Sequence, residues 1–382
     1  MGLSNKSTVF WEEIMTKKIC LIVRILRFTG FLFLAVIFFS CASTPAVNSQ
    51  PAKGNNQPAT PLPPLWVTDQ EKAYPDRDWL CVVEAEQDVK LAQNAAVVRL
   101  SQVFRVDLVS ITDANRQLAE SIHNVMGKKV TITSQSSSIA QELVSTSTVS
   151  GLIGLQVESW SNPNGRSYAN ARMNRRECSA RYLSMIRDNE KAISGLMEEA
   201  NRNPRTFEAY QMLNLAYTFA QVTDNFHTLL TVLDPSAIST RPSYGNAMAL
   251  KSLADNAKRS IVVTVKVDGD NAGRIEKAFT ETLNTRGFRT GSSGDSSYVL
   301  SASLQVDAAD IANANNYKYA RYILNYSLKN KAGVELFSSS DNGREGHTSD
   351  SEARQRAIRA AEQSIATTGF AVNFDAFFAS LL

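Results

Sequence analysis

A single apolar run near the N-terminus constrains this chain more than any other feature. Residues 28–39 read FTGFLFLAVIFF, and four positive charges stand before them within residues 17–27. A helix that crosses a bilayer needs about 20 apolar residues, whereas the apolar part of a secretory signal needs roughly 7–15. The run therefore predicts an export signal, and we expect the signal peptide to cover residues 1–40.

The apolar run is closed by a cysteine with small neighbours. Cys41 follows Ser40 and precedes Ala42. This arrangement resembles the lipobox of bacterial lipoproteins, in which the cysteine sulfur carries diacylglycerol and the signal is cut just before it. Phe38 and Phe39 depart from the common pattern. The looser lipobox of spirochaetal lipoproteins is the nearer likeness.

The lipobox resemblance implies what happens to the N-terminus. The mature protein would begin at Cys41, which would be lipidated, with palmitate among the fatty acids. The lipid would hold the protein in the outer membrane, facing the periplasm or the cell surface. An uncleaved signal anchor, an ordinary signal and translation from Met15 are the alternatives.

Residues 41–64 follow as a segment rich in Pro, Asn, Gln, Ser and Thr, with few large apolar side chains. Such a segment cannot bury enough apolar surface to offset the entropy that ordering would remove. We expect a disordered linker that tethers a folded body.

The charge balance gives no sign of a nucleic-acid partner. The chain has 40 Lys and Arg against 37 Asp and Glu, and five of the basic and two of the acidic residues precede Cys41. The mature chain would therefore carry 35 of each sign. A neutral chain lacks the basic excess on which binding to nucleic acid depends.

Residues 65–202 are expected to form a first α+β domain. Short apolar or alternating runs predict strands, and apolar residues at spacings of three and four predict helices. An Asn-Gly pair at 164–165 predicts a hairpin turn. The predicted elements are a strand at 79–85, a helix at 89–103, a strand at 104–111, an irregular excursion at 112–147, a hairpin of 149–157 with 166–173, and a helix at 175–200.

Several of these residues together resemble the LPP-twenty family of bacterial outer-membrane lipoproteins, over roughly residues 64–200. The resemblance is carried by Pro64, Leu65, Trp66 and Val67, the strand that ends near Glu84 and Ala85, the alanine-rich helix, and the residues Trp160, Gly165, Tyr168, Ala169, Ala171, Met173 and Arg175. The long polar excursion and the absence of a glycine after the first strand depart from the family. The resemblance implies an envelope-structural role and supplies no active-site residue.

Residues 203–258 are expected to form a helical connector, and residues 259–382 a second α+β domain. Residues 204–235 carry two apolar stripes, which predict a helical hairpin packed on a neighbouring domain. The elements predicted for the second domain are a strand at 261–267, a helix at 272–283 with Asp270 as its N-cap, strands at 298–306, 322–328 and 334–337, and a helix at 353–365.

The predicted fold class is therefore α+β. We expect two domains of similar topology, each an antiparallel sheet with helices on one face. The helical hairpin joins them, and the signal peptide and the linker precede them.

No motif specifies catalysis, a metal or a cofactor. His123, His227 and His347 lack a second ligand at helix or strand spacing. Residues 268–273 break the calcium-loop pattern, and residues 291–297 lack the ending of a phosphate-binding loop. We interpret these two stretches as a helix-capping turn and a loop, and we expect no enzyme, no cofactor and no metal site.

Two further sets of residues leave alternatives open. Cys81 and Cys178 are the thiols of the mature chain besides Cys41, and they form either a disulfide, in an oxidising compartment, or two core cysteines. A run of arginines forms either a solvated surface or a basic patch for anionic lipid headgroups, lipopolysaccharide or an acidic partner. The patch would comprise Arg166, Arg172, Arg175, Arg176 and Arg181.

Together these features predict a lipid-anchored lipoprotein of the cell envelope, with a structural or adaptor role and other envelope proteins as partners. A module that binds peptidoglycan, glycan or lipid is the second interpretation, and a periplasmic enzyme of unrecognised chemistry is the third. A deep pocket with converging polar groups would favour ligand binding, and a flat exposed apolar patch would favour a protein partner. The oligomeric state is not specified by any of these features.

Overall fold

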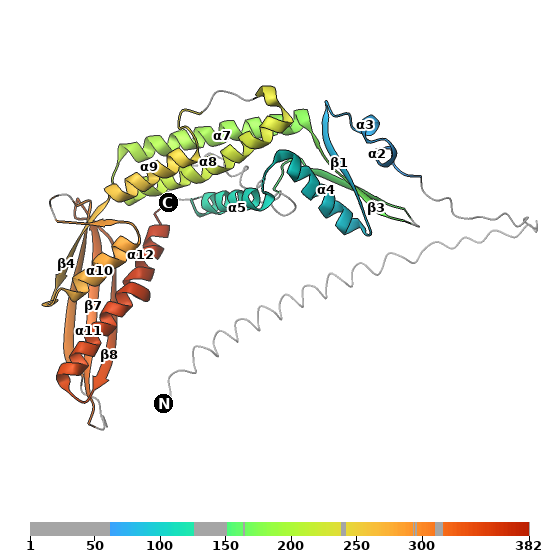
Figure 1. The fold of residues 1–382 in the computed structure, drawn as a ribbon. Coiled ribbons are helices and arrows are strands. Elements are labelled where there is room, and N and C mark those ends of the chain that lie inside the picture. The colour runs from blue at the N-terminus through green and yellow to red at the C-terminus, as the bar shows by residue number, and fades with distance from the viewer. Residues whose placement is uncertain are drawn as a thin grey trace, which may run out of the picture. The chain divides into compact units, whose positions relative to one another are not determined.

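The structure is a computed structural model, and it describes residues 62–125, 151–162, 165–237, 242–292, 294, 296–309 and 316–381. The described chain is an α+β structure with two separate sheets (Figure 1). The signal, Cys41 and most of the linker lie outside the described residues.

The first described helices protect the edge of the first sheet. They are α2 (Leu65–Thr68) and α3 (Gln70–Ala73). Trp66 of α2 is buried, and the Gln70 side chain donates a hydrogen bond to the Cys81 carbonyl at 3.0 Å. This carbonyl belongs to an edge strand, so α3 satisfies a group that strand pairing leaves free.

The first sheet has three antiparallel strands in the order β1-β3-β2: β1 (Trp79–Glu86), β2 (Gln156–Ser161) and β3 (Ser167–Asn174). The predicted first strand and the second arm of the predicted hairpin are confirmed. The first arm lies later than predicted, because residues 151–155 form turns and β2 begins only at Gln156. One face of the sheet is covered by α4 (Val89–Phe104), which was also predicted. Ala92 and Ala96 of α4 and Ala169 and Ala171 of β3 are fully buried. Small side chains on both elements let the helix approach the sheet closely.

The prediction of a strand at 104–111 followed by irregular chain is wrong where the structure describes it. α4 continues to Phe104, and α5 spans Leu108–Val125. α5 buries Ile111, Leu118 and Ile122 on one stripe, although polar residues surround them in the sequence. Residues 126–147 of the predicted excursion lie outside the described residues.

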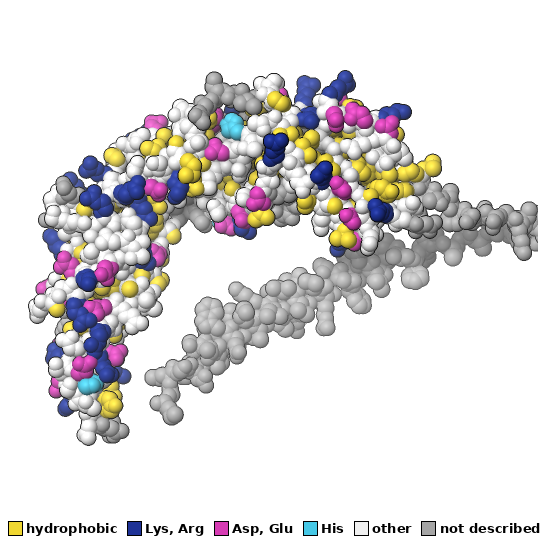
Figure 2. Space-filling view, in the orientation of Figure 1, with side chains coloured by type: hydrophobic (Ala, Val, Ile, Leu, Met, Phe, Trp, Pro, Cys, Tyr) yellow, Lys and Arg dark blue, Asp and Glu magenta, His cyan; other side chains and the backbone are white. Residues whose placement is uncertain are grey.

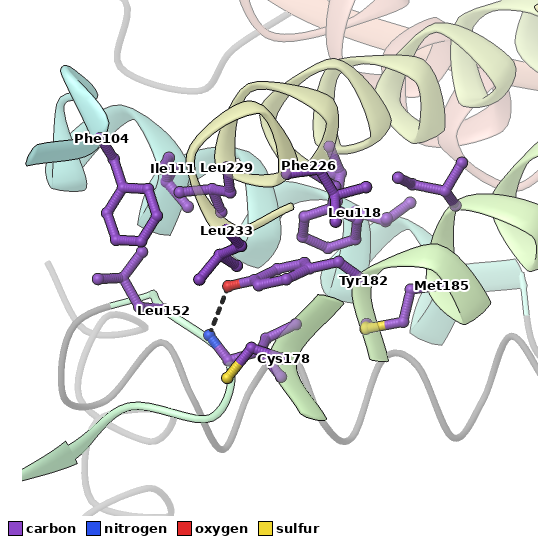
Figure 3. Packing of buried hydrophobic residues seen from close by; sticks show 14 of the residues in the cluster. Phe104, Ile111, Leu118, Leu152, Cys178, Tyr182, Met185, Phe226, Leu229 and Leu233 are labelled. Carbon is purple, nitrogen blue, oxygen red and sulfur yellow. Dashed lines mark hydrogen bonds between the residues drawn. The ribbon is translucent and has the colours of Figure 1, made fainter. Parts of the chain in front are cut away.

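Tyr182 lies at the centre of the first core (Figure 3). It belongs to α7 (Arg175–Arg202), and its hydroxyl accepts a hydrogen bond from the Ile153 backbone N–H at 2.9 Å. Its ring centroid lies 5.1 Å from that of Phe226. The hydrogen bond fixes the chain that enters β2, and the ring joins this chain to the helices.

The predicted helical hairpin at 204–235 is wrong, because a single helix, α8 (Phe207–Leu233), spans most of this stretch. The sequence of α8 itself contains no Gly or Pro that would break the helix. Both apolar stripes lie on this one helix. Phe207 belongs to the second core, whereas residues from Leu215 to Leu233 belong to the first. α8 packs between α7 and α9 (Ala247–Ser260), after the short turn η1 (Pro235–Ala237).

The second sheet has five strands in the order β5-β4-β6-β7-β8: β4 (Val262–Asp268), β5 (Arg289–Thr290), β6 (Tyr298–Ala309), β7 (Lys318–Asn330) and β8 (Glu335–His347). The sheet is mixed and not antiparallel as predicted, because β4 runs parallel to β5 and β6. α10 (Arg274–Thr285) carries the chain back to the starting end of β4, as parallel pairing requires.

The order of the strands also differs between the two sheets. β6 lies beside β4, whereas in the first sheet β3 separates β2 from β1. The shared order of strand, helix, strands and helix along the chain therefore does not produce the same topology.

Three helices lie on one face of the second sheet (Figure 1): α10, α11 (Asp350–Thr367) and α12 (Phe370–Ala379). α11 was predicted, and its Ala353, Ala357, Ala361 and Ile365 are fully buried. The sequence did not predict α12 as a separate helix. Basic and acidic side chains alternate over the outer side of α11 (Figure 2).

Two bidentate ion pairs fasten these helices to each other. Arg274 of α10 contacts Glu362 of α11 at 2.6 and 2.5 Å. Arg286, just after α10, contacts Asp375 of α12 at 2.7 Å through two nitrogens. Such two-point pairs fix the orientation of the helices as well as their separation.

Candidate functional site

The candidate anchor, Cys41, lies outside the described residues, together with the apolar run before it. None of the described helices combines the length and the apolar character needed to cross a bilayer. The structure therefore leaves lipidation at Cys41 as a prediction.

Cys81 lies on β1, on the face of the first sheet that α4 does not cover. Its Sγ donates a hydrogen bond to Asn170 Oδ1 at 3.1 Å. Burial raises the pKa of the Cys81 thiol to about 11, although the Asn170 hydrogen bond opposes this. Because the thiolate is the reactive form, this cysteine is a poor nucleophile at neutral pH.

Cys178 lies in the first turn of α7 and is also buried. Its Sγ lies 3.9 Å from the Gly154 carbonyl oxygen, and burial raises its pKa to about 11. Cys178 and Cys81 are both free thiols in this structure. The disulfide considered from the sequence is therefore not formed here.

Arg172 and Arg175 of the candidate patch contact other elements of the fold. Arg172 pairs with Glu158 at 2.7 Å, and its guanidinium lies 4.6 Å from the Tyr74 ring centroid. Arg175 donates to the carbonyl of Asp76 at 2.8 Å and to that of Val232 at 2.6 Å. The second bond satisfies a carbonyl in the last turn of α8, where cations also interact well with the helix dipole.

The other three patch arginines are exposed. Arg166 lies in the turn between β2 and β3, and Arg176 and Arg181 lie on α7. The structure thus gives the five arginines different environments. Whether the exposed three recruit an anionic partner stays a prediction.

The histidines occupy three separate elements. His123 is exposed near the end of α5, and His227 lies half-buried in α8. His347 ends β8, with its Nδ1 3.4 Å from the Ser349 hydroxyl. Within the described residues, no group of three or more His, Cys, Asp or Glu side chains is placed to hold a metal ion.

The turn at 268–273 serves the helix that follows it. The Asp270 carboxylate accepts hydrogen bonds from the backbone N–H groups of Arg274, Ile275 and Glu276 at 3.1, 2.7 and 2.9 Å. Gly273 occupies the formal N-cap position, but the capping side chain is Asp270. These bonds explain the acidic turn without a cation.

The loop after β5 packs against β4. Thr264 Oγ1 donates to the Gly291 carbonyl at 3.0 Å, and the Gly291 N–H donates to Val263. Two residues of the predicted loop, 293 and 295, lie outside the described residues.

A cavity of about 1020 Å³ lies beside the first half of α8. Its apolar lining includes Leu196, Met212, Phe219 and Leu336. The acidic groups Glu198 and Glu199, which also line it, both pair with Arg202. These two carboxylates of the lining are thus used in ion pairs.

The second sheet has an open face opposite α10, α11 and α12. Side chains alternate along β6 and β7, so the residues between the buried ones point away from the helices. Two rows cross the strands β6, β7 and β8 on this face in register, and we call them the hydroxyl–amide rows. They consist of Ser301, Ser327 and Ser338, and of Ser303, Asn325 and Ser340. All six residues line a shallow hollow of about 550 Å³.

A pair of arginines lies on the same face, farther along the strands. Arg321 of β7 stands directly opposite Arg344 of β8, and Asp307 of β6 stands opposite Arg321. Asp307 instead accepts a hydrogen bond from Gln305 at 2.7 Å. The Arg344 guanidinium lies 5.8 Å from the Tyr319 ring centroid.

The sequence analysis did not identify this open face. The signal was present as serines between the apolar residues of 298–306 and in the run Ser338–Ser340. These serines become a surface only once the order and register of the strands are known.

Comparisons with known proteins give the following results. No protein-family model matches the chain, and no curated protein matches it. A minor lipoprotein from Acinetobacter baumannii is 10% identical over 31% of this chain and 90% of its own, with a TM-score of 0.24. A lipoprotein from Neisseria meningitidis is 14% identical over 28% of this chain and 99% of its own, with a TM-score of 0.20.

A secreted protein from Helicobacter pylori matches a longer stretch. It is 10% identical over 76% of this chain and 98% of its own, with a TM-score of 0.34. The chain thus has structural similarity to bacterial lipoproteins over roughly a third of its length. At these identities and scores the similarity does not identify a family, so membership of LPP-twenty stays an expectation.

Proposed function

We propose that this chain is a lipid-anchored protein of the cell envelope, held in the outer membrane through Cys41. The observation that carries the proposal is the order of segments at the N-terminus. An apolar run too short to span a bilayer ends at a cysteine with small neighbours, and a Pro-rich polar linker leads from it to the first helix at Leu65. Each segment has the properties that a tethered body requires.

The folded part acts as a structural or adaptor element in this proposal, and no catalytic step belongs to it. α8 contributes side chains to both cores. Such a shared helix suits a protein that holds two binding surfaces in a fixed arrangement, and not one that encloses a substrate. Other envelope proteins are the proposed partners.

Metabolic labelling with a radiolabelled fatty acid tests the anchor. The wild-type protein is expected to carry the label and to fractionate with the outer membrane, whereas Cys41→Ala loses the label. Cys20→Ala serves as the matched control, because Cys20 lies inside the expected signal and its removal should not change labelling. Label retained in Cys41→Ala would overturn the anchor.

A second candidate function is glycan binding, and the open face of the second sheet favours it. The hydroxyl–amide rows present donors and acceptors together on a broad surface. Sugars display the same kinds of group.

A further inference from the structure

We infer that the open face of the second sheet binds an anionic polysaccharide, with Arg321 and Arg344 holding its acidic group. This inference rests on the second candidate function and is independent of the anchor at Cys41. Three features of the face carry it: unused hydrogen-bonding groups, an arginine pair without a counter-ion, and a net positive charge.

The hydroxyl–amide rows have unused hydrogen-bonding capacity. None of their six side chains makes a hydrogen bond to another described residue. Ser303, Asn325, Ser338 and Ser340 are exposed, while Ser301 and Ser327 are half-buried. Hydroxyl and amide groups can each donate and accept, which matches the hydroxyl and acylamino groups of a sugar chain.

The arginine pair has no ion-pair partner among the described residues. Like charges that stand directly opposite each other on neighbouring strands destabilise a sheet. Arg321 and Arg344 stand in this relation, and neither forms an ion pair with a described carboxylate. Asp307, in register with Arg321, is instead bonded to Gln305. An anionic group from a ligand would contact both guanidiniums and remove the repulsion.

The charge of the face favours an anion over a neutral sugar. By strand register, Arg289, Lys266 and Lys329 join the arginine pair on this side of the sheet, against three carboxylates, Asp268, Asp307 and Glu335. The face therefore has five positive charges and three negative ones. A carboxylate or a phosphate on the polysaccharide would complement this excess.

Two other classes of partner fit the face less well. A protein partner needs aromatic or aliphatic anchors at the centre of its interface, but the rows contain only Ser and Asn. A membrane surface needs apolar side chains that insert beside the cations, and Ile323 is the one large aliphatic residue that separates the rows from the arginine pair.

Pelleting assays with the full-length, detergent-solubilised protein test the inference. Two probes distinguish the source of the acidic group: purified peptidoglycan sacculi, which carry carboxylates, and lipopolysaccharide aggregates, which carry phosphates. Vesicles of phosphatidylglycerol supply negative charge without a glycan. We expect the wild-type protein to bind one of the two glycan probes and to release it as salt is raised.

The decisive variant is Arg321→Ala with Arg344→Ala. Loss of two charge-assisted contacts should weaken glycan binding by about tenfold or more. The double Lys variant keeps the charge but loses the planar fork, and it should bind with intermediate strength. Arg187→Ala, an exposed arginine of α7, is the matched control and should bind like the wild type.

The remaining outcomes are also decisive. Because removal of an opposed like-charge pair does not disrupt packing, the double Ala variant should melt no lower than the wild type. Binding unchanged in that variant, binding to neither glycan, or equal binding to phosphatidylglycerol vesicles would each overturn the inference. If Cys41 is labelled while glycan binding fails, the anchor stands and the glycan site falls.

Discussion

The hydroxyl of Tyr298 accepts a hydrogen bond from the backbone N–H of Phe207 at 2.9 Å, and the two rings stack with centroids 4.0 Å apart. Phe207 is the first residue of α8, and Tyr298 is the first residue of β6. This contact joins the start of α8, the helix shared by the two cores, to the start of β6 in the second sheet. Burial raises the pKa of the Tyr298 hydroxyl, which favours its protonated form.

Tyr298→Phe is expected to lower the free energy of unfolding by about 1–3 kcal/mol, because it leaves a buried N–H without its acceptor. Urea denaturation followed by circular dichroism measures the change. Tyr317→Phe is the control, since Tyr317 is exposed and should change stability by much less. Equal effects of the two substitutions would contradict the role of the Tyr298 hydroxyl.

The ion pair between Arg286 and Asp375 predicts a pH-dependent contribution to stability. The hydrogen bond from Arg286 lowers the pKa of Asp375. The stabilisation is therefore complete above the unfolded-state pKa of about 3.9, and it is lost as the pH falls through the lower pKa of the folded state. Because the Asp375 side chain is 60% exposed, we expect no more than about 1 kcal/mol.

Denaturation of Asp375→Asn and of the wild type at pH 7 and near pH 2.5 measures this contribution. The difference in unfolding free energy should be present at pH 7 and shrink at the acidic pH. Asp268→Asn, at an exposed position, should show little difference at either pH. A difference of the same size at both pH values would argue against the ion pair.

Asp270→Ala should destabilise the protein by about 1–2 kcal/mol, because three backbone N–H groups at the start of α10 lose their acceptor. Thermal denaturation checks this, and Asp268→Ala is the neighbouring control. If calcium stabilised the wild type and not Asp270→Ala, the capping explanation would be incomplete.

Asn115 predicts a substitution that increases stability. It is fully buried on α5, and neither its amide nitrogen nor its amide oxygen has a hydrogen-bond partner within the part of the chain that the structure describes. Its neighbours on the buried stripe are Ile111, Leu118 and Ile122. Asn115→Leu should therefore raise the free energy of unfolding by about 1–3 kcal/mol, since it removes an unsatisfied polar group. A control, Gln117→Leu at an exposed position of α5, addresses helix propensity alone. A loss of stability in Asn115→Leu would show that the amide has a partner.

The thiols of Cys81 and Cys178 should remain free and react slowly. With a pKa of about 11 each, the thiolate is scarce at pH 8. Mass spectrometry after alkylation without a reductant should find both cysteines alkylated in the denatured protein and neither in the native protein after a short exposure. A peptide pair linked through Cys81 and Cys178 would show that a disulfide forms in the cell.

The sequence predicted those elements whose side chains alternate strongly or form a clear apolar stripe. β1, β3, β6 and β7 were found because one face of each strand is apolar and buried. α4 and α11 were found because buried alanines repeat at a spacing of four.

The elements that were missed are stabilised by contacts with segments far away along the chain, which the local sequence pattern does not reveal. In α5, polar residues separate the few buried apolar ones, so the sequence shows only a weak apolar stripe. Its packing partner is α8, about a hundred residues away along the chain. β8 was predicted only for its first residues, because its middle is Ser338–Asn342 and its strand conformation depends on backbone pairing with β7. The open face could not be predicted for the same reason, since its rows combine three strands.

Phe207 belongs to the second core, and the residues of α8 beyond Leu215 belong to the first. One helix of 27 residues is thus shared by two hydrophobic interiors. Helical hydrogen bonds propagate cooperatively, so fraying that starts in one interior is resisted by the packing of the other. Evolution therefore cannot easily exchange one half of this protein for an unrelated module, because any cut through residues 207–233 deprives both halves of side chains that they need.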